Sequence, residues 1–311
     1  MDNNKLFPQK ISCMLWFDNQ AEEAVSFYTS LFPNAKAGQK TYYSADDHDT
    51  HYHPVKKLMT YDFVLDGHQF IALNGGPKFS VNPSISFYVA YDHDYFIEEL
   101  WSDLADKGTI LIPFEKHELS SKYGKLIDRF DVTWHIALAD RSNIEEDRIT
   151  PLFSFINQQT GKAEEAVDFY TGIFNNSAKN EVLYYSEKDL PEIAGQAKNI
   201  HFTLETQHFM ASDSSIFHLY DFNEAISFIV HCQNQDEIDY YWDKLSQNGE
   251  EQLCGWLKDP YGVSWQILPD IFFEMLLLKN SVLTHEMFKL LEKTKKINIE
   301  ALNQLKERYL H

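Results

Sequence analysis

Cysteine is scarce in this chain of 311 residues, which contains only Cys13, Cys232 and Cys254. Three scattered thiols without a CxxC pair exclude a disulfide framework of the kind that stabilises small secreted domains. Long apolar runs are also missing, because the longest, Ile271 to Leu278, is interrupted by Glu274 and is far shorter than the roughly 20 residues that cross a bilayer. The N-terminal residues contain no apolar signal segment. We therefore expect a cytoplasmic protein without a membrane partner.

Positive charge is the second shortage. Lysine and arginine number 27 against 47 aspartates and glutamates, which gives a net charge of −20 at pH 7. Such a surface repels phosphate backbones and anionic lipids, so we expect no nucleic-acid partner either. Aromatic residues, in contrast, are plentiful: 23 Phe, 17 Tyr and 6 Trp within a hydrophobic fraction of 44%. This composition is sufficient for a large core, and the length suggests two domains of about 150 residues each.

The chain contains an internal repeat. Residues 21–32, AEEAVSFYTSLF, and residues 163–174, AEEAVDFYTGIF, are identical at nine of twelve positions, and further matching segments follow in the same order. Self-similarity of this kind identifies a duplicated structural unit. We therefore predict a first domain over residues 8–139, a second over 148–270, and a tail over 271–311. The tail shows apolar stripes typical of two or three short helices, which would pack across a sheet or between the copies, or alternatively form a dimer contact.

Each copy shows a β-α-β-β-β pattern written twice. In the first helix of the first copy, Ala21, Ala24, Val25, Tyr28 and Leu31 fall on one face, as in an amphipathic helix. The same pattern of apolar runs and turn residues predicts strands over residues 11–17, 58–65, 69–73, 85–91, 132–138 and 152–156, and helices over 21–31 and 94–107. The predicted fold class is α+β, with four such units in the chain.

Several motifs resemble one known family. They are ISCMLWFDNQAEEA at residues 11–24, ALNGG at 72–76, ISFIVHC at 226–232 and CGWLKDPYGVSWQI at 254–267. In this order they are similar to the PhnB-like proteins of the vicinal oxygen chelate superfamily, which includes glyoxalases, bleomycin-resistance proteins and dioxygenases. PhnB-like proteins are often labelled 3-demethylubiquinone-9 3-methyltransferase-like. The resemblance implies two tandem glyoxalase-like domains, whose paired βαβββ modules form curved mixed sheets around a cleft. The first copy is the diverged half, because Lys125 to Asp128 precede its late strand where the second copy has the CGW motif.

The resemblance also locates the positions at which many superfamily enzymes bind a divalent metal. The position on the first strand falls on Cys13 in the first copy and on Pro151 in the second, and the late-strand position falls on His135 and Gln266. A metal site needs about three protein ligands, so neither copy is expected to hold a complete one. We expect no cofactor, and a metal-dependent lyase, isomerase or dioxygenase remains the alternative function.

Three other kinds of site have weaker support in the sequence. The segment Asp46 to His53 has histidines at metal-like spacing, but a solvated acidic loop explains it better. A Cys13–His135 pair could act as an activated nucleophile, although an isolated cysteine on an apolar strand usually packs as a small hydrophobe. Methyl transfer has no cofactor motif, since Gly75-Gly76 is followed directly by Pro77. No catalytic residue is assigned.

An aromatic-lined cleft that binds a small organic molecule is the function we predict from the sequence. The resemblance places several tryptophans near the cleft strands, and such pockets combine apolar walls with a few polar groups. About half of the aromatic candidates are expected in the core. The candidate ligand-binding residues are Cys13, Trp16, Asn74, Trp134, His135, Trp256, Trp265 and Gln266. The two copies pair with each other or within a homodimer.

Overall fold

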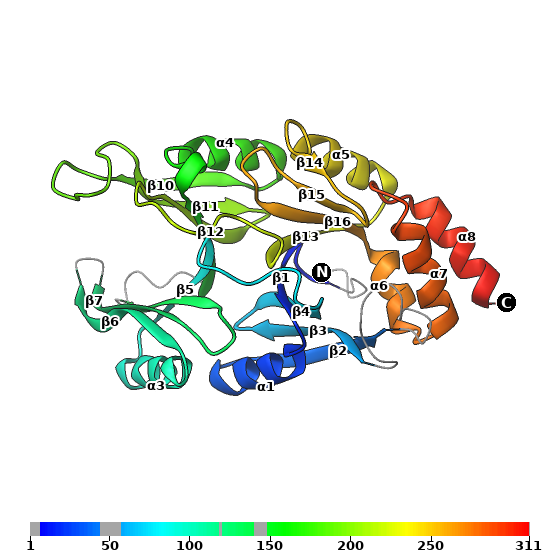
Figure 1. Cartoon of the computed structure of the whole chain (residues 1–311), viewed down its shortest axis with the longest axis horizontal. Coiled ribbons are helices and arrows are strands. Elements are labelled where there is room, and N and C mark those ends of the chain that lie inside the picture. The colour runs from blue at the N-terminus through cyan, green and yellow to red at the C-terminus, as the bar shows by residue number, and fades with distance from the viewer. Residues whose placement is uncertain (1–6, 44–56, 118–119, 140–147, 311) are drawn as a thin grey trace.

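A computed structural model of the chain describes residues 7–43, 57–117, 120–139 and 148–310 (Figure 1). The first copy contains β1 (Ile11–Phe17), α1 (Ala21–Leu31), β2 (Lys36–Tyr42), β3 (Leu58–Leu65), β4 (His68–Asn74), β5 (Ile85–Tyr91), α3 (Asp94–Ala105), β6 (Thr109–His117), β7 (Ser120–Ile127) and β8 (Thr133–Leu138). The second copy contains β9 (Ile149–Phe155), α4 (Ala163–Ile173), β10 (Ala178–Tyr184), β11 (Ala197–Leu204), β12 (Gln207–Asp213), β13 (Ile226–Cys232), α5 (Gln235–Leu245), β14 (Glu250–Glu251), β15 (Trp256–Lys258) and β16 (Ser264–Pro269). The tail contains α6 (Asp270–Leu277), α7 (Ser281–Leu291) and α8 (Ile299–Leu310).

The strands form two eight-stranded mixed sheets, and each sheet takes half of its strands from each copy. Sheet A has the order β14-β15-β16-β13-β1-β4-β3-β2, and sheet B has the order β10-β11-β12-β9-β5-β8-β7-β6. The junctions are antiparallel, with β1 beside β13 and β5 beside β9. The sequence left open how the copies pair; in this chain they pair with each other.

The main core lies between the two sheets. Its largest hydrophobic cluster contains buried side chains from strands of both sheets and from α1, α3, α4 and α5. The phenyl rings of Phe70 in sheet A and Phe87 in sheet B are 5.2 Å apart, and those of Phe228 and Phe153 are 5.0 Å apart. The central strands thus have one face toward this core, and we call the opposite face the outer face of the sheet.

A buried aspartate anchors the turn that precedes the late strand in each copy. The carboxylate of Asp128 accepts hydrogen bonds from the Tyr28 hydroxyl (2.7 Å), the Trp134 Nε1–H (2.8 Å) and two backbone N–H groups. Asp259 makes the same set of bonds with Tyr170 and Trp265. Burial raises the pKa of both carboxyls to about 6, against the opposing effect of these donors. This repeated arrangement connects the first helix of each copy to its late strand.

Local sequence patterns predict most of these helices and strands. The buried residues of α1 are Ala21, Ala24, Val25 and Tyr28, as the periodicity predicts. The predicted helix from residue 94 ends at Ala105, two residues early, and Lys107 then has a positive φ of 60°. At the hairpin between β3 and β4, Asp66 and Gly67 both have positive φ, as a type I′ turn requires.

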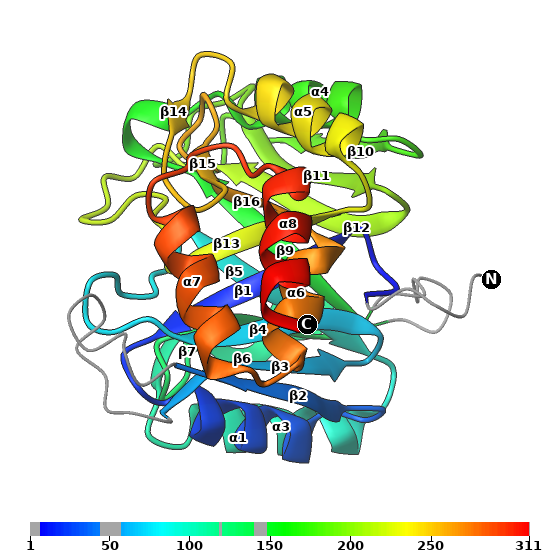
Figure 2. The same ribbon diagram turned by 90° about the vertical axis from the view of Figure 1, so that its right-hand side faces the viewer.

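The tail folds into three helices that lie against the outer face of sheet A (Figure 2). A second hydrophobic cluster joins strand residues such as Met14 and Ile229 to buried tail residues such as Met275, Leu283 and Met287. Of the roles predicted for the tail, packing across a sheet is the one observed. No helix within the described ranges has the length and apolarity required to cross a membrane.

Candidate functional site

The outer faces of the two sheets carry matching rows of side chains. In sheet B, cross-strand pairing places Lys125, His135, Tyr88 and Thr150 next to one another across β7, β8, β5 and β9. In sheet A, the same pairing places Trp256, Gln266, Ile229 and Ser12 across β15, β16, β13 and β1. The Lys125–His135 pair therefore occupies the position that Trp256 and Gln266 occupy in the other sheet.

The row in sheet A is packed beneath or beside the tail. Gln266 is buried, and its Nε2 lies 3.0 Å from the Ser227 Oγ and 3.1 Å from the Met14 Sδ. Trp256 packs against the tail cluster, with its ring 6.3 Å from that of Trp16. Apolar side chains of the chain itself thus occupy this face, and they cover the polar candidate Gln266.

The row in sheet B centres on a buried neutral histidine. His135 is 7% exposed; its Nε2 lies 3.0 Å from the Ser86 Oγ and its Nδ1 lies 2.7 Å from the Tyr123 hydroxyl. Burial lowers the pKa of His135 well below its usual value, and the charge of Lys125 lowers it further. A neutral imidazole has one donor and one acceptor nitrogen, so one of the two hydroxyls donates to the ring and the other accepts from it.

Lys125 supplies a positive charge to the same face. Its side chain is partly buried, and burial lowers the pKa of its ammonium group. The same charge lowers the pKa of His218, which lies in the segment between β12 and β13, although burial is the larger cause there. Sequence reasoning missed Lys125. The available signal was the alignment of YGKLID at residues 123–128 with CGWLKD at 254–259, which replaces a tryptophan by a lysine.

The donor set on the outer face of sheet B does not fit a divalent metal. The side chains around His135 are the hydroxyls of Ser86 and Tyr123 and the cationic Lys125, and among the described residues no carboxylate is a hydrogen-bond partner of His135. Within the described ranges, no three His, Cys, Asp or Glu side chains are grouped as metal ligands. A divalent site needs about three such ligands, and a neighbouring ammonium group opposes a cation. We derive no step through a metal.

The position that the family resemblance placed on the first strand of each copy, Cys13 and Pro151, is displaced by one residue from the outward-facing one. Cys13 lies in the main core, and Pro151 shares the core-facing side of β9 with its neighbours Ile149 and Phe153. Because side chains alternate along a strand, the outward positions are one residue earlier, at Ser12 and Thr150, which the rows above contain. The residues that face outward there carry hydroxyls.

The proposed Cys13–His135 pair does not form, because Cys13 on sheet A lies in the main core whereas His135 lies on the outer face of sheet B. The Sγ of Cys13 instead lies 3.4 Å from the Nε2 of His68, and burial raises the pKa of the thiol. The thiolate is the nucleophilic form, so this environment favours packing rather than reaction.

Three more candidates have structural roles. Trp134 and Trp265 are buried in the main core, where each donates to the aspartate of its own copy. The Oδ1 of Asn74 accepts a hydrogen bond from the first backbone N–H of α1, at Ala21 (2.9 Å). Of the eight candidates, His135 alone lies on the outer face of sheet B. The segment Asp46 to His53 lies outside the described residues.

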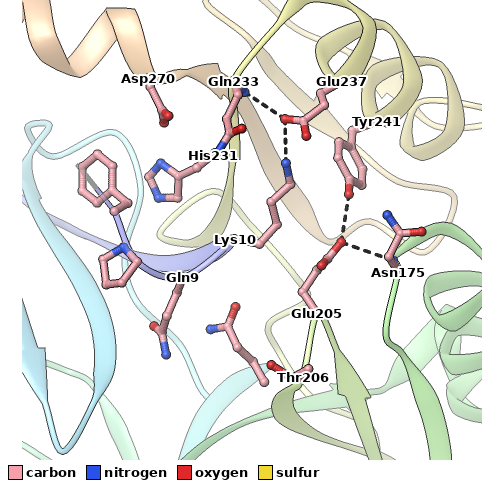
Figure 3. A pocket seen from close by; sticks show the side chains of 13 residues that line it. Gln9, Lys10, Asn175, Glu205, Thr206, His231, Gln233, Glu237, Tyr241 and Asp270 are labelled. Carbon is pink, nitrogen blue, oxygen red and sulfur yellow. Dashed lines mark hydrogen bonds and ion pairs between the residues drawn. The ribbon is translucent and has the colours of Figure 1, made fainter. Parts of the chain in front are cut away.

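A depression of about 520 Å³ lies at the start of β1, beside α5 and the β11–β12 turn (Figure 3). Two of its acidic side chains already have partners: Glu237 pairs with Lys10 at 2.8 Å, and Glu205 accepts from the Tyr241 hydroxyl at 3.1 Å. The ring of His231 forms part of the wall, and burial lowers its pKa to about 3. These internal pairs satisfy the main charges of the depression, so it is the weaker candidate.

Comparison with known proteins relates this architecture to solved structures. Glyoxalase I from Zea mays is 12% identical over 86% of this chain and 95% of its own, with a TM-score of 0.54, which shows a shared fold. A putative 3-demethylubiquinone-9 3-methyltransferase, PhnB protein, from Bacillus cereus is 32% identical over 42% of this chain and all of its own, with a TM-score of 0.39. Curated proteins gave no match.

The model of one protein family matches the chain twice, over residues 9–137 and 147–268. Together the two matches cover most of the chain, one for each copy of the repeat. The chain therefore belongs to the family described as 3-demethylubiquinone-9 3-methyltransferase and contains two tandem copies of its unit.

Proposed function

We propose that this protein binds a small organic molecule on the outer face of sheet B. One observation carries the proposal: matching positions on the two sheets hold different side chains, and only those of sheet A are packed under the tail. Trp256 and Gln266 contact neighbouring apolar groups, whereas Lys125 and His135 present a charge and a polar ring. Concave sheet faces with a few polar groups are typical small-molecule sites.

The chemistry of this face supports binding and orientation rather than a metal-dependent reaction. Neutral His135 is connected to Ser86 and Tyr123, so its ring orientation is set by two hydrogen bonds. A ligand above the row would meet an ammonium group, a ring held in place and the side chain of Tyr88. The alternative function, a metal-dependent lyase, isomerase or dioxygenase, has less support, because the described residues of this face do not provide the ligands that a metal needs.

Methyl transfer, which the family description names, also lacks support in this chain. A doubly wound methyltransferase binds its cofactor where a parallel strand runs through a glycine-rich turn into a helix. Here Gly75 and Gly76 follow β4, and residues 77–84 contain no helix. The sheets are mixed, with antiparallel junctions between the copies.

Histidine NMR tests the location of binding. We would titrate the full chain with benzamide and benzoate and follow the imidazole nitrogens of His135, assigned by His135→Gln. A ligand of this size at about 0.45 kcal/mol per heavy atom has a Kd on the order of 1 mM. We expect saturable shifts at His135 and none at His231, which lies on sheet A and is assigned by His231→Gln. Absence of a shift at His135 with both probes at about 10 mM would overturn the proposal.

A further inference from the structure

The surroundings of Lys125 point to the class of ligand, an inference that rests on the function proposed above. Lys125 is partly buried, and among the described residues it has neither a carboxylate partner nor a side-chain hydrogen bond. Lys122, three residues earlier on β7, pairs with both Asp94 and Glu98. Lys10 and Lys258 pair with Glu237 and Glu224 in the same way. In a chain with a net charge of −20, a partly buried lysine with neither an acidic partner nor a side-chain hydrogen bond needs a reason.

The groups nearest in the row do not neutralise this charge. His135 is next to Lys125 in the cross-strand register, and its burial keeps the imidazole neutral. Burial is the cause that lowers the pKa of the lysine, and no carboxylate of the described residues opposes it. Removing a cation from water without a counter-charge is costly, whereas an anion placed beside it would recover that cost.

We propose that the ligand on the outer face of sheet B carries an anionic group, of the carboxylate type, that pairs with the ammonium of Lys125. A carboxylate accepts hydrogen bonds only, which suits the donors of the lysine. A charge-assisted bond of this kind is stronger than a neutral one. The matching position in sheet A, Trp256, carries no charge, so the anion preference belongs to one face only.

A pair of probes that differ in charge tests this inference. Benzoate and benzamide have nearly the same shape, and their dissociation constants would be measured by calorimetry with the full chain. We expect benzoate to bind about tenfold or more tighter than benzamide, since a hydrogen bond to a charged group is typically worth about 1.5–3 kcal/mol. In Lys125→Met the ratio should fall to about twofold or less, and Lys125→Arg should restore it.

Lys116→Met is the matched control, because it removes one exposed lysine from β6 in the same sheet and leaves the net charge change identical. We expect this variant to keep the wild-type ratio, and thermal unfolding would verify that each variant is folded. Equal affinity for the two probes in the wild type, or a benzoate preference that survives Lys125→Met, would overturn the anion inference alone. Failure of both probes to bind would overturn the proposed function itself.

Discussion

The buried imidazole of His231 should make the protein less stable in mild acid. The side chain is 4% exposed, its Nε2 lies 2.8 Å from the Ser12 Oγ, and its ring stacks on Phe7 with centroids 4.0 Å apart. Burial first, and then the charge of Lys10, lowers its pKa from 6.5 to about 3. The perturbation we propose is His231→Gln, which keeps a side chain able to bond to Ser12 and removes the titration.

The direction and magnitude of the change in unfolding free energy follow from proton linkage. Because the pKa is lower in the folded state, the unfolded chain binds more protons between about pH 6.5 and pH 3. The stabilising contribution is therefore complete above pH 6.5 and is lost as the pH falls toward 3. Between pH 7 and pH 4.5 the loss is about 2 units at about 1.36 kcal/mol each, or about 2.7 kcal/mol.

Urea unfolding at pH 7 and pH 4.5 measures this contribution. Carboxylates titrate over the same range, so the comparison is between proteins: the wild type should lose about 2–3 kcal/mol more unfolding free energy than His231→Gln. The exposed His93 provides the control, because His93→Gln should follow the wild type. If His231→Gln and the wild type lose the same free energy within about 0.5 kcal/mol, the inferred neutral imidazole is wrong.

Two further predictions concern the tail and the thiols. Leu283→Ala, at a fully buried position of the tail cluster, should lower the unfolding free energy by about 2–4 kcal/mol. The exposed Val282→Ala should change it by less than about 0.5 kcal/mol, and similar losses in both variants would contradict the packing of the tail on sheet A. A thiol reagent should label Cys254 in the folded protein before Cys13 or Cys232, which are buried. Labelling should be slow at pH 8, because burial raises the pKa of Cys254 to about 11, and equal rates at the three thiols would refute the burial pattern.

Local sequence patterns predicted the helices and strands better than they predicted which strands pair with each other. The repeat at residues 21–32 and 163–174 and the helical periodicity identified the units, because both depend on neighbouring residues. The junction between β1 and β13 joins residues more than 200 positions apart, and no local signal encodes it. The predicted strand over residues 152–156 begins three residues earlier in the structure, at Ile149. The sequence pattern missed this start because Pro151 is unusual in the interior of a strand.

The candidate site was predicted less well, for a geometric reason. A shift of one residue on a strand moves a side chain to the opposite face, so the carry-over onto Cys13 selected a core residue instead of outward-facing Ser12. Trp134 and Trp265 lie in the main core for the same reason, since each directly precedes an outward-facing residue of its strand. The alignment of residues 123–128 with 254–259 marks Lys125 as a substitution, but its place beside His135 follows only from the strand register.

Joining the two copies in one chain makes the difference between the faces possible. In a dimer of identical single copies, a twofold axis would relate the two faces, and any substitution would appear on both. Here the position of Trp256 on sheet A could keep an apolar residue that the tail covers, while the matching position on sheet B became Lys125. A tail that follows only the second copy likewise covers only one face. Duplication thus allows the two faces to differ. The outer face of sheet A packs under the tail, and the outer face of sheet B, where we propose binding, takes Lys125 and His135 from the diverged first copy.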